Sequence, residues 1–449
     1  MKRRREEDCK AGACRGALPK ANRGNLQEER SEFSQQPRQS VHNDGKGGHN
    51  IEDLLPDELL CHVLQALPTD GVAIAARTCR RWFGCCPKTL RHKLGIRWAC
   101  SSMSMLQWAL QNGYALSDKN ACSAAAEQGA LEVLQWAREH GCAWDEETTK
   151  NAAMGGHLKV LQWARLQGCP WNEWTCSYAA MNGHLEVLQW AHENGCPWDD
   201  YTTLTATEGG HLQVLQWLWE HGCPLHSSAC NIAAGQGRLD ILKWAHANVA
   251  EEEAQVHFTE VTCLSAAKSG HMAVLQWLRE TARCPWDQLS SAAAAGRGDL
   301  NMLKWVKEHR CSWNQLTCNS AALHGHLEVL KWARENGCPW NQFTCAMAAE
   351  GGHLEVLQWL RENGCPWSED TCSLAANQGH LAVLRWAREN GCPWDSATCF
   401  HAAQRGDLEI LKWAREHGCP WNSMVMKAAV AAGHSAVVVW LRQNGCPES

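Results

Sequence analysis

The hydrophobic positions of this chain recur in a repeated unit, most clearly between residues 172 and 198. Within that stretch, apolar residues fall at helical spacing on one face of the segment 184–193, and polar residues fill the other face. The apolar positions are Leu185, Val187, Leu188 and Ala191, with Trp190 at their margin, and the polar ones are Glu186, Gln189 and Glu193. The pattern predicts an amphipathic helix over about residues 184–193.

A second predicted helix, rich in small residues, precedes it over residues 175–181. Asn172 is a candidate N-cap, and Glu173 lies in the first turn, where the helix dipole favours a negative charge. Gly183 and Gly195 each follow a helix, where glycine tolerates the left-handed conformation of a helix stop. Pro197 prevents continuation of the second helix. Each unit is therefore predicted to be an antiparallel helix hairpin closed by a Cys-Pro-Trp turn.

The tryptophan of the second helix marks the units along the chain. Its positions are 108, 136, 163, 190, 217, 244, 277, 305, 332, 359, 386, 413 and 440. Most steps are 27 residues (190 − 163), and the step from Trp244 to Trp277 is 33 residues (277 − 244). Such a period is typical of a solenoid, whose units bury their apolar faces against their neighbours. The segment 248–261 within the long step is expected to form either one longer finger or an acidic surface loop.

The unit resembles the ankyrin repeat. The matching residues are Ala179-Ala180, Gly183-His184-Leu185, Val187-Leu188 and Asn194-Gly195, and the resemblance extends over residues 99–446. Two features differ: the usual Thr-Pro-Leu-His opening is absent, with Cys176 near the place of its buried leucine, and the unit is too short for the β-hairpin finger. The resemblance implies stacked helix pairs with short fingers, and a histidine, His184 in this unit, that orders the turn between the helices.

Residues 51–90 follow a different pattern, three short helices punctuated by prolines at positions 56 and 68. This segment resembles an F-box. The matching residues are Leu55-Pro56, Glu58-Leu59-Leu60, Val63-Leu64, Leu67-Pro68 and Cys79-Arg80-Arg81-Trp82, while Gly71-Val72 replaces the frequent Asp-Leu of the family. The resemblance implies docking onto the linker subunit of a cullin–RING ubiquitin ligase. The residues expected to make that contact are Leu55, Pro56, Leu59, Leu60, Val63, Leu64 and Trp82. Alternatively, these helices only cap the repeat array, which needs a polar-faced end.

These patterns divide the chain into four parts. Residues 1–50 are polar and are expected to be a disordered tail, whose basic start at residues 2–5 is either a nuclear import signal or a solvated charge cluster. Residues 51–90 are the F-box-like domain, residues 91–121 are a connector with the first partial repeat, and residues 122–449 are the array. The predicted fold is all-α: a helical-hairpin solenoid of ankyrin-like repeats preceded by a small three-helix F-box-like domain.

Composition restricts the location and the partners. The chain has 26 cysteines, and equivalent cysteines of adjacent units stand one helix-packing distance apart, roughly 8–10 Å. A disulfide needs Cα atoms within about 7 Å, so we expect reduced thiols and a cytoplasmic location, with the nucleus as an alternative. No run of about 18 apolar residues occurs, which predicts no membrane contact. With 42 basic and 48 acidic residues there is no basic stripe, and we expect no nucleic-acid partner.

No motif for catalysis or metal binding stands out from the repeats. The sequence contains no Gly-x-Ser-x-Gly and no P-loop, and its Cys and His residues lack the short Cys-x₂₋₄-Cys spacing of zinc sites. We therefore expect no catalytic residue, no cofactor and no metal ion.

The positions where the units differ carry the functional prediction. Residues repeated in every unit maintain the stacking, whereas varied positions on the first helix are free to encode a partner. The candidates for a protein-binding face are Trp174, Tyr178, Tyr201, Phe343, Met347, Leu374, Phe400 and His401, with the densest group at 340–405. Exposed aromatic, Met and Leu side chains are typical interface anchors, and the alternative is neutral variation.

Together these features predict a non-enzymatic, protein-binding adaptor. In the leading hypothesis it is the substrate-recruiting subunit of a cullin–RING (SCF-type) ubiquitin ligase and holds a target protein on its concave repeat face. In the alternative, it is a stand-alone ankyrin-like interaction scaffold, with residues 51–90 serving only as a cap.

Overall fold

The computed structural model describes residues 99–111, 120–249 and 257–448. Within these residues the regular structure is entirely helical, with 25 α-helices, one 3₁₀ helix and no strand. The predicted all-α fold class is confirmed. In the same part of the chain, no helix combines the length and the apolar character that a membrane span requires.

The helices form a hairpin array in which the first and second helices of each unit occupy separate layers. The 3₁₀ helix η2 (Ala99–Ser101) and α5 (Met103–Gln111) open the array. The first helices, here called inner helices, are α6 (Asn120–Glu127), α8 (Glu146–Met154), α10 (Glu173–Met181), α12 (Asp200–Glu208), α14 (Ala229–Gly235), α17 (Glu260–Ser269), α19 (Gln288–Gly296), α21 (Gln315–Leu323), α23 (Gln342–Glu350), α25 (Glu369–Gln378), α27 (Ser396–Arg405) and α29 (Ser423–Ala431).

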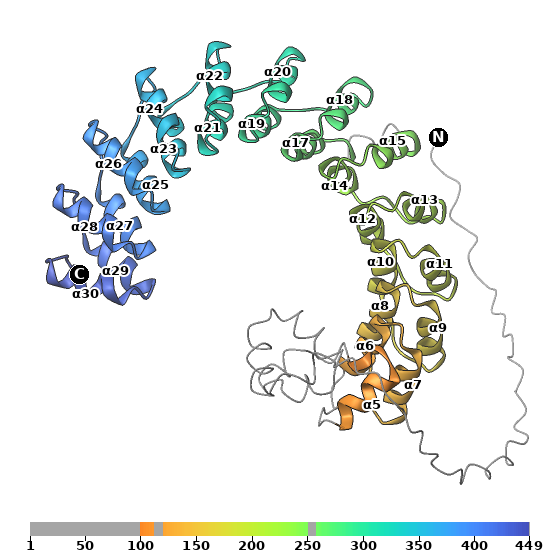
Figure 1. The fold of residues 1–449 in the computed structure, drawn as a ribbon. Helices are drawn as coiled ribbons and strands as arrows, with labels where there is room; N and C mark the ends of the chain where they lie inside the picture. The colour runs from red at the N-terminus through yellow and green to blue at the C-terminus, as the bar shows by residue number, and fades with distance from the viewer. Residues whose placement is uncertain (1–98, 112–119, 250–256, 449) are drawn as a thin grey trace, which may run out of the picture.

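The second helices are here called outer helices. They are α7 (Leu131–Glu139), α9 (Leu158–Leu166), α11 (Leu185–Glu193), α13 (Leu212–Glu220), α15 (Leu239–Asn248), α18 (Met272–Glu280), α20 (Leu300–Glu308), α22 (Leu327–Glu335), α24 (Leu354–Glu362), α26 (Leu381–Glu389), α28 (Leu408–Glu416) and α30 (Ser435–Gln443). The array bends into a hook, with the inner helices on its concave side and the outer helices on its convex side (Figure 1). Successive inner helices pack against one another throughout.

Side-chain caps define where seven of the inner helices begin. The backbone N–H of Trp174 donates to Oδ1 of Asn172 at 3.2 Å, which satisfies one of the free amides of the first turn. Asp145, Asp287, Asn314, Asn341, Asp395 and Asn422 cap their helices in the same way. The inner helix of the example unit ends at Gly183, whose φ of +76° requires glycine. The predicted N-cap and helix stop of this unit are therefore present.

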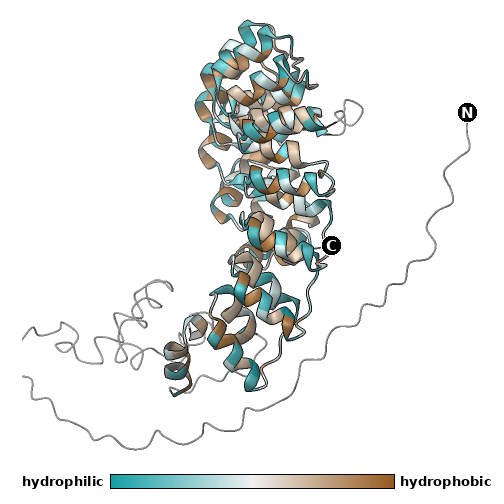
Figure 2. Ribbon diagram, turned by 90° about the vertical axis from the view of Figure 1, so that its right-hand side faces the viewer, coloured by the Kyte–Doolittle hydropathy of each residue, from teal (hydrophilic) through white to brown (hydrophobic). Residues whose placement is uncertain are grey.

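The core runs between the two layers without interruption. In the unit of α10 and α11, Cys176 and Ala180 from the inner helix and Leu188 and Ala191 from the outer helix are fully buried. Equivalent residues continue one apolar cluster from Cys100 to Cys446. Apolar and polar stretches alternate along the helices of the whole array (Figure 2), as expected where each unit buries one face against its neighbours.

The long step of the repeat lies between α15 and α17, and residues 250–256 are outside the described part. After this gap, His257 and Phe258 are buried. The Phe258 ring lies 6.4 Å from the ring of Trp277 and 5.7 Å from that of His246. Phe258 thus packs on the outer-helix tryptophan, as the tryptophan of the Cys-Pro-Trp turn does in other units. The described end of the insertion is folded onto the array, and Thr259 caps α17.

Candidate protein-binding face

The histidine of each Gly-His turn links neighbouring units. Nε2–H of His184 donates to the carbonyl oxygen of Met154 at 3.1 Å, 30 residues earlier, and His380 makes the same bond to Glu350 at 3.0 Å. These carbonyls belong to the last turn of the preceding inner helix, where they lack intrahelical partners. Burial lowers the pKa of His353. The structure gives these histidines a role in stacking.

The cysteines form buried pairs within single units, a contact that the sequence analysis missed. Sγ of Cys345 on an inner helix lies 3.9 Å from the carbonyl oxygen of Cys365, 20 residues later in the turn. Where serine replaces the inner cysteine, Oγ of Ser291 lies 3.6 Å from Sγ of Cys311. The constant interval of 20 residues is the signal that could have revealed the pair, because it recurs from unit to unit.

Burial makes many of these thiols poorly reactive. Sγ of Cys365 donates to the carbonyl oxygen of the N-cap Asn341 at 3.4 Å, and the same contact recurs along the array. All cysteines of the described residues are buried and free of disulfides. Burial raises the pKa of Cys169 and Cys230 to about 12, and a hydrogen bond with Cys365 together with burial raises that of Cys345. Protonated thiols are weak nucleophiles and weak metal ligands. Among the described residues, no group of three or more ligand-type side chains is placed to hold a metal ion.

The outer face repeats one aromatic arrangement. The guanidinium carbon of Arg361 lies 4.0 Å from the ring centroid of Trp367, the turn tryptophan of the same unit, and the same stack occurs between Arg165 and Trp171. His192 replaces the arginine in one unit and stacks on Trp198 with ring centroids 3.7 Å apart. Each stack covers a unit from outside and forms the lid of its core.

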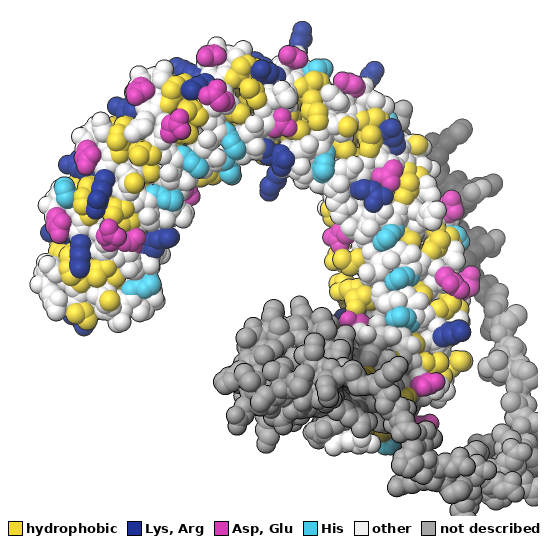
Figure 3. Space-filling view, viewed as in Figure 1, with side chains coloured by type: hydrophobic (Ala, Val, Ile, Leu, Met, Phe, Trp, Pro, Cys, Tyr) yellow, Lys and Arg dark blue, Asp and Glu magenta, His cyan; other side chains and the backbone are white. Residues whose placement is uncertain are grey.

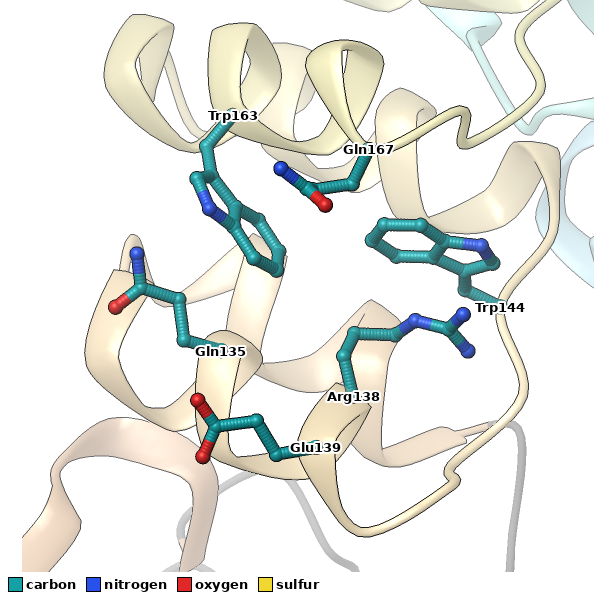
Figure 4. Close-up of a pocket in the computed structure, with 6 residues that line it drawn as sticks. All are labelled: Gln135, Arg138, Glu139, Trp144, Trp163 and Gln167. Atoms are coloured by element: carbon teal, nitrogen blue, oxygen red, sulfur yellow. The ribbon is translucent and has the colours of Figure 1, made fainter. Parts of the chain in front are cut away.

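One open depression of about 520 Å³ lies on this outer face. Figure 4 shows its lining residues, which are Gln135, Arg138, Glu139, Trp144, Trp163 and Gln167. Arg138 stacks on Trp144 at 4.1 Å, and the rings of Trp144 and Trp163 meet edge to face at 5.9 Å. Because these contacts recur in other units, we interpret the depression as a by-product of the repeated lid.

The predicted target-face residues all lie on inner helices, in two groups. Trp174, Tyr178 and Tyr201 lie together on α10 and α12, with the Trp174 ring 6.2 Å from that of Tyr178 and 5.3 Å from that of Tyr201. The second group extends over three helices. It comprises Phe343 and Met347 on α23, Leu374 on α25, and Phe400 and His401 on α27.

These candidates differ in exposure. Trp174, Tyr201 and Phe343 are exposed, at 40%, 36% and 46%. Tyr178, Met347, Leu374, Phe400 and His401 are only half-buried. They lie about one helical turn further along their helices, where the neighbouring inner helices pack, so the group at 340–405 presents little apolar surface. The predicted ligase-docking residues, from Leu55 to Trp82, lie outside the described part of the chain.

Three further exposed apolar residues complete a row that the sequence analysis overlooked. Val261, Leu289 and Leu316 occupy the same position as Trp174, Tyr201 and Phe343, the second residue after the N-cap of an inner helix. We call these six residues the inner row. Aligning the units on their N-caps would have revealed it, but the long repeat step obscures that register. Hydrophobic side chains are visible along the inner margin of the arm formed by α8 to α12 (Figure 3).

Comparison with known protein families supports the F-box-like prediction for the first part of the chain. Residues 53–97 match the family described as F-box-like. The chain carries an F-box-like domain ahead of a helical-hairpin solenoid. No curated protein matches the chain.

The solved structures with which the chain aligns include the pentatricopeptide repeat protein PPR10 in complex with an 18-nt psaJ RNA element, and a cysteine-to-serine variant of the same complex. Each alignment has 14% identity and a TM-score of 0.37, and it covers 87% of this chain and 74% of that one. The repeats of these two solved structures are pentatricopeptide repeats, not ankyrin repeats. Because both neighbours hold RNA, the exclusion of nucleic acid drawn from charge is withdrawn. A similarity this low carries no argument that this chain binds RNA.

Proposed function

We propose that this chain is a non-enzymatic adaptor that recruits a target protein to a cullin–RING ubiquitin ligase. The observation that carries the proposal is the F-box-like match at residues 53–97, directly ahead of a solenoid with exposed apolar residues on its concave side. In this arrangement the F-box-like domain would bind the ligase linker subunit through the apolar residues between Leu55 and Trp82. The inner helices would hold the target.

The repeat itself is proposed to be a short ankyrin-like unit. The Ala-Ala, Gly-His-Leu and Val-Leu residues of the unit support this assignment, and so does the regular place of the turn histidine, whose ring bonds the preceding unit. The free and buried thiols are compatible with a reducing compartment, so we propose the cytoplasm, or the nucleus, as the place of action.

Co-purification tests the ligase contact. The full chain, a chain lacking residues 51–97 and the double variant Leu59→Asp/Leu60→Asp would each be co-expressed with the ligase linker and cullin subunits. The full chain should retain both subunits, and the deletion and the double variant should lose them, because charge replaces apolar contact area at the docking surface. The matched control is Phe343→Gln, which changes an exposed inner-row residue and should retain the ligase subunits.

Loss of both subunits from the full chain as well would contradict the adaptor proposal. The chain would then be a repeat scaffold whose first helices serve as a cap. Circular dichroism of the double variant, with unchanged helical content, shows that a lost contact is not a folding defect.

A further inference from the structure

The inner row is an apolar feature with one gap, in the unit of α14. Its members are one per unit, and each is between 36% and 50% exposed. Six of the seven consecutive units from α10 to α23 contribute to it. In the remaining unit the inner helix α14 begins later, and its N-cap Ser228 stands 27 residues (228 − 201) after Tyr201. Glu147 and Asp370 occupy the same position in the units before and after. These charged residues bound the row, and the same position is again apolar on α29, where Met424 is 52% exposed.

The charge beside the row changes along its length. The residue next to the row, at the first position of each inner helix, is acidic in the early units, at Glu173, Asp200 and Glu260. In the later units it is glutamine, at Gln288, Gln315 and Gln342. The helix dipole stabilises a carboxylate at this position, but the units with glutamine show that the helix forms without a carboxylate there. The part of the row from α10 to α17, here called the acidic half, therefore favours a basic ligand. In the part from α19 to α23, the glutamine amides can hydrogen-bond a peptide backbone.

Basic side chains are few on the inner helices that carry the row. Lys150 pairs with Glu147 and lies 5.3 Å from the ring centroid of Tyr178. Lys268 and Arg297 lie at the opposite ends of their inner helices, where Arg297 donates to the carbonyl oxygen of Lys268 at 3.1 Å. A nine-residue helix is about 13 Å long, so these charges leave the acidic half of the row unneutralised.

The spacing of the row fits an extended chain. Packed helices lie roughly 8–10 Å apart, and three residues of extended polypeptide span about 9–10 Å. The row would measure roughly 50–60 Å from Trp174 to Phe343. A single straight helix of that length cannot follow the concave side of the hook, whereas an extended segment can (Figure 1).

We propose that the inner row binds an extended segment of a partner protein, with one apolar side chain at every third residue. The segment carries Lys or Arg between these residues in the half that crosses α10 to α17. The inference rests on the proposed function, in which the concave side holds the target, and it defines the chemistry of that target.

Binding of a defined peptide to the full chain tests the proposal. The probe is a fluorescein-labelled 21-residue peptide of seven triplets, with Leu at the first position of each triplet except the third, where Ser faces Ser228. Lys fills the other positions of the first four triplets, and Ser and Gln fill the rest. Because either chain direction can fit, the reversed sequence is measured too. A peptide of the same composition with Leu at every second position is the control.

Fluorescence anisotropy should show that the better of the two chain directions binds at least tenfold more tightly than the control peptide. The variant Leu289→Gln/Leu316→Gln/Phe343→Gln should lose at least tenfold in affinity. A matched variant with three exposed apolar residues outside the row, Leu166→Gln/Val430→Gln/Val439→Gln, should change it by less than twofold. High salt should weaken binding, because the acidic half contributes through charge.

Equal affinity for the two leucine spacings, or full binding by the row variant, would overturn the inference. A gain of more than tenfold on removing residues 1–50 would also overturn it, since the chain's own basic tail would then occupy the row. Ligase co-purification and peptide binding are both measured on the unsubstituted full chain. Retained ligase subunits with absent peptide binding refute this inference alone, and lost ligase subunits with intact peptide binding refute only the ligase proposal.

Discussion

The outer face of the array repeats the same residues from unit to unit, whereas the inner row varies them. On the outer face, the same contact returns from unit to unit: Arg361 stacks on Trp367 as Arg165 stacks on Trp171, and where arginine is missing, His192 takes its place. On the inner row, one position of the same fold holds Trp174, Tyr201, Val261, Leu289, Leu316 or Phe343. The comparison teaches that repeated residues maintain the stacking, whereas an exposed position that keeps its apolar character but varies in shape is suited to recognition.

The same contrast holds for polar groups. His184 bonds a carbonyl of the preceding unit and Cys365 bonds the N-cap carbonyl of its own unit, so these two repeated side chains each satisfy a backbone group. The inner row has no such bond to make, because its side chains are apolar. Substitutions should therefore separate the two classes of position by their effect on stability.

A large contrast is expected at two glycines with the same backbone conformation. Gly183 and Gly195 have φ of +76° and +83°, so alanine at either costs about 1–2 kcal/mol of backbone strain. A Cβ at Gly183 would also lie 2.6 Å from the ring of His211 in the next unit, whereas at Gly195 it meets nothing within 4 Å. Gly183→Ala should therefore lower the free energy of unfolding more than Gly195→Ala, as measured by urea denaturation.

The variant Gly183→Ala/His211→Ala decides the cause of that difference. If the histidine ring is the obstacle, the loss caused by alanine at 183 should be smaller in the His211→Ala background than in the original chain. Equal losses at the two glycines in the original chain would contradict the role of the turn histidine in unit stacking.

A smaller effect is expected on the outer face. Arg361→Gln removes the stack on Trp367 together with the hydrogen bond that Arg361 donates to the carbonyl oxygen of Cys365, and a cation–π contact of this kind contributes about 0.5–1 kcal/mol. Arg442→Gln, the matched control, removes only the exposed ion pair with Glu448, which should change stability by less than about 0.5 kcal/mol. Urea denaturation of the two variants compares them, and an equal loss would show that the stack is not part of the lid.

The sequence was sufficient for the local fold but not for the surface. Asn172, Gly183 and His184 could be placed because capping and helix stops depend on residues within one unit. The pairing of Cys345 with Cys365 was missed because it joins two elements through the hairpin geometry. Tyr178, Met347 and Leu374 were expected to be exposed, yet the neighbouring inner helices cover half of each. Val261, Leu289 and Leu316 were overlooked because their exposure depends on how the units stack across the 33-residue step.

The central claim is that the inner row serves recognition and the repeated core serves folding. Urea denaturation of Leu289→Gln/Leu316→Gln/Phe343→Gln beside Leu357→Ala tests this most directly. Leu357 is fully buried on α24, so its loss should cost about 2–5 kcal/mol. Each inner-row substitution should change the free energy of unfolding by no more than about 0.5 kcal/mol. A loss per inner-row residue as large as that of Leu357→Ala would contradict the account, because the row would then belong to the core.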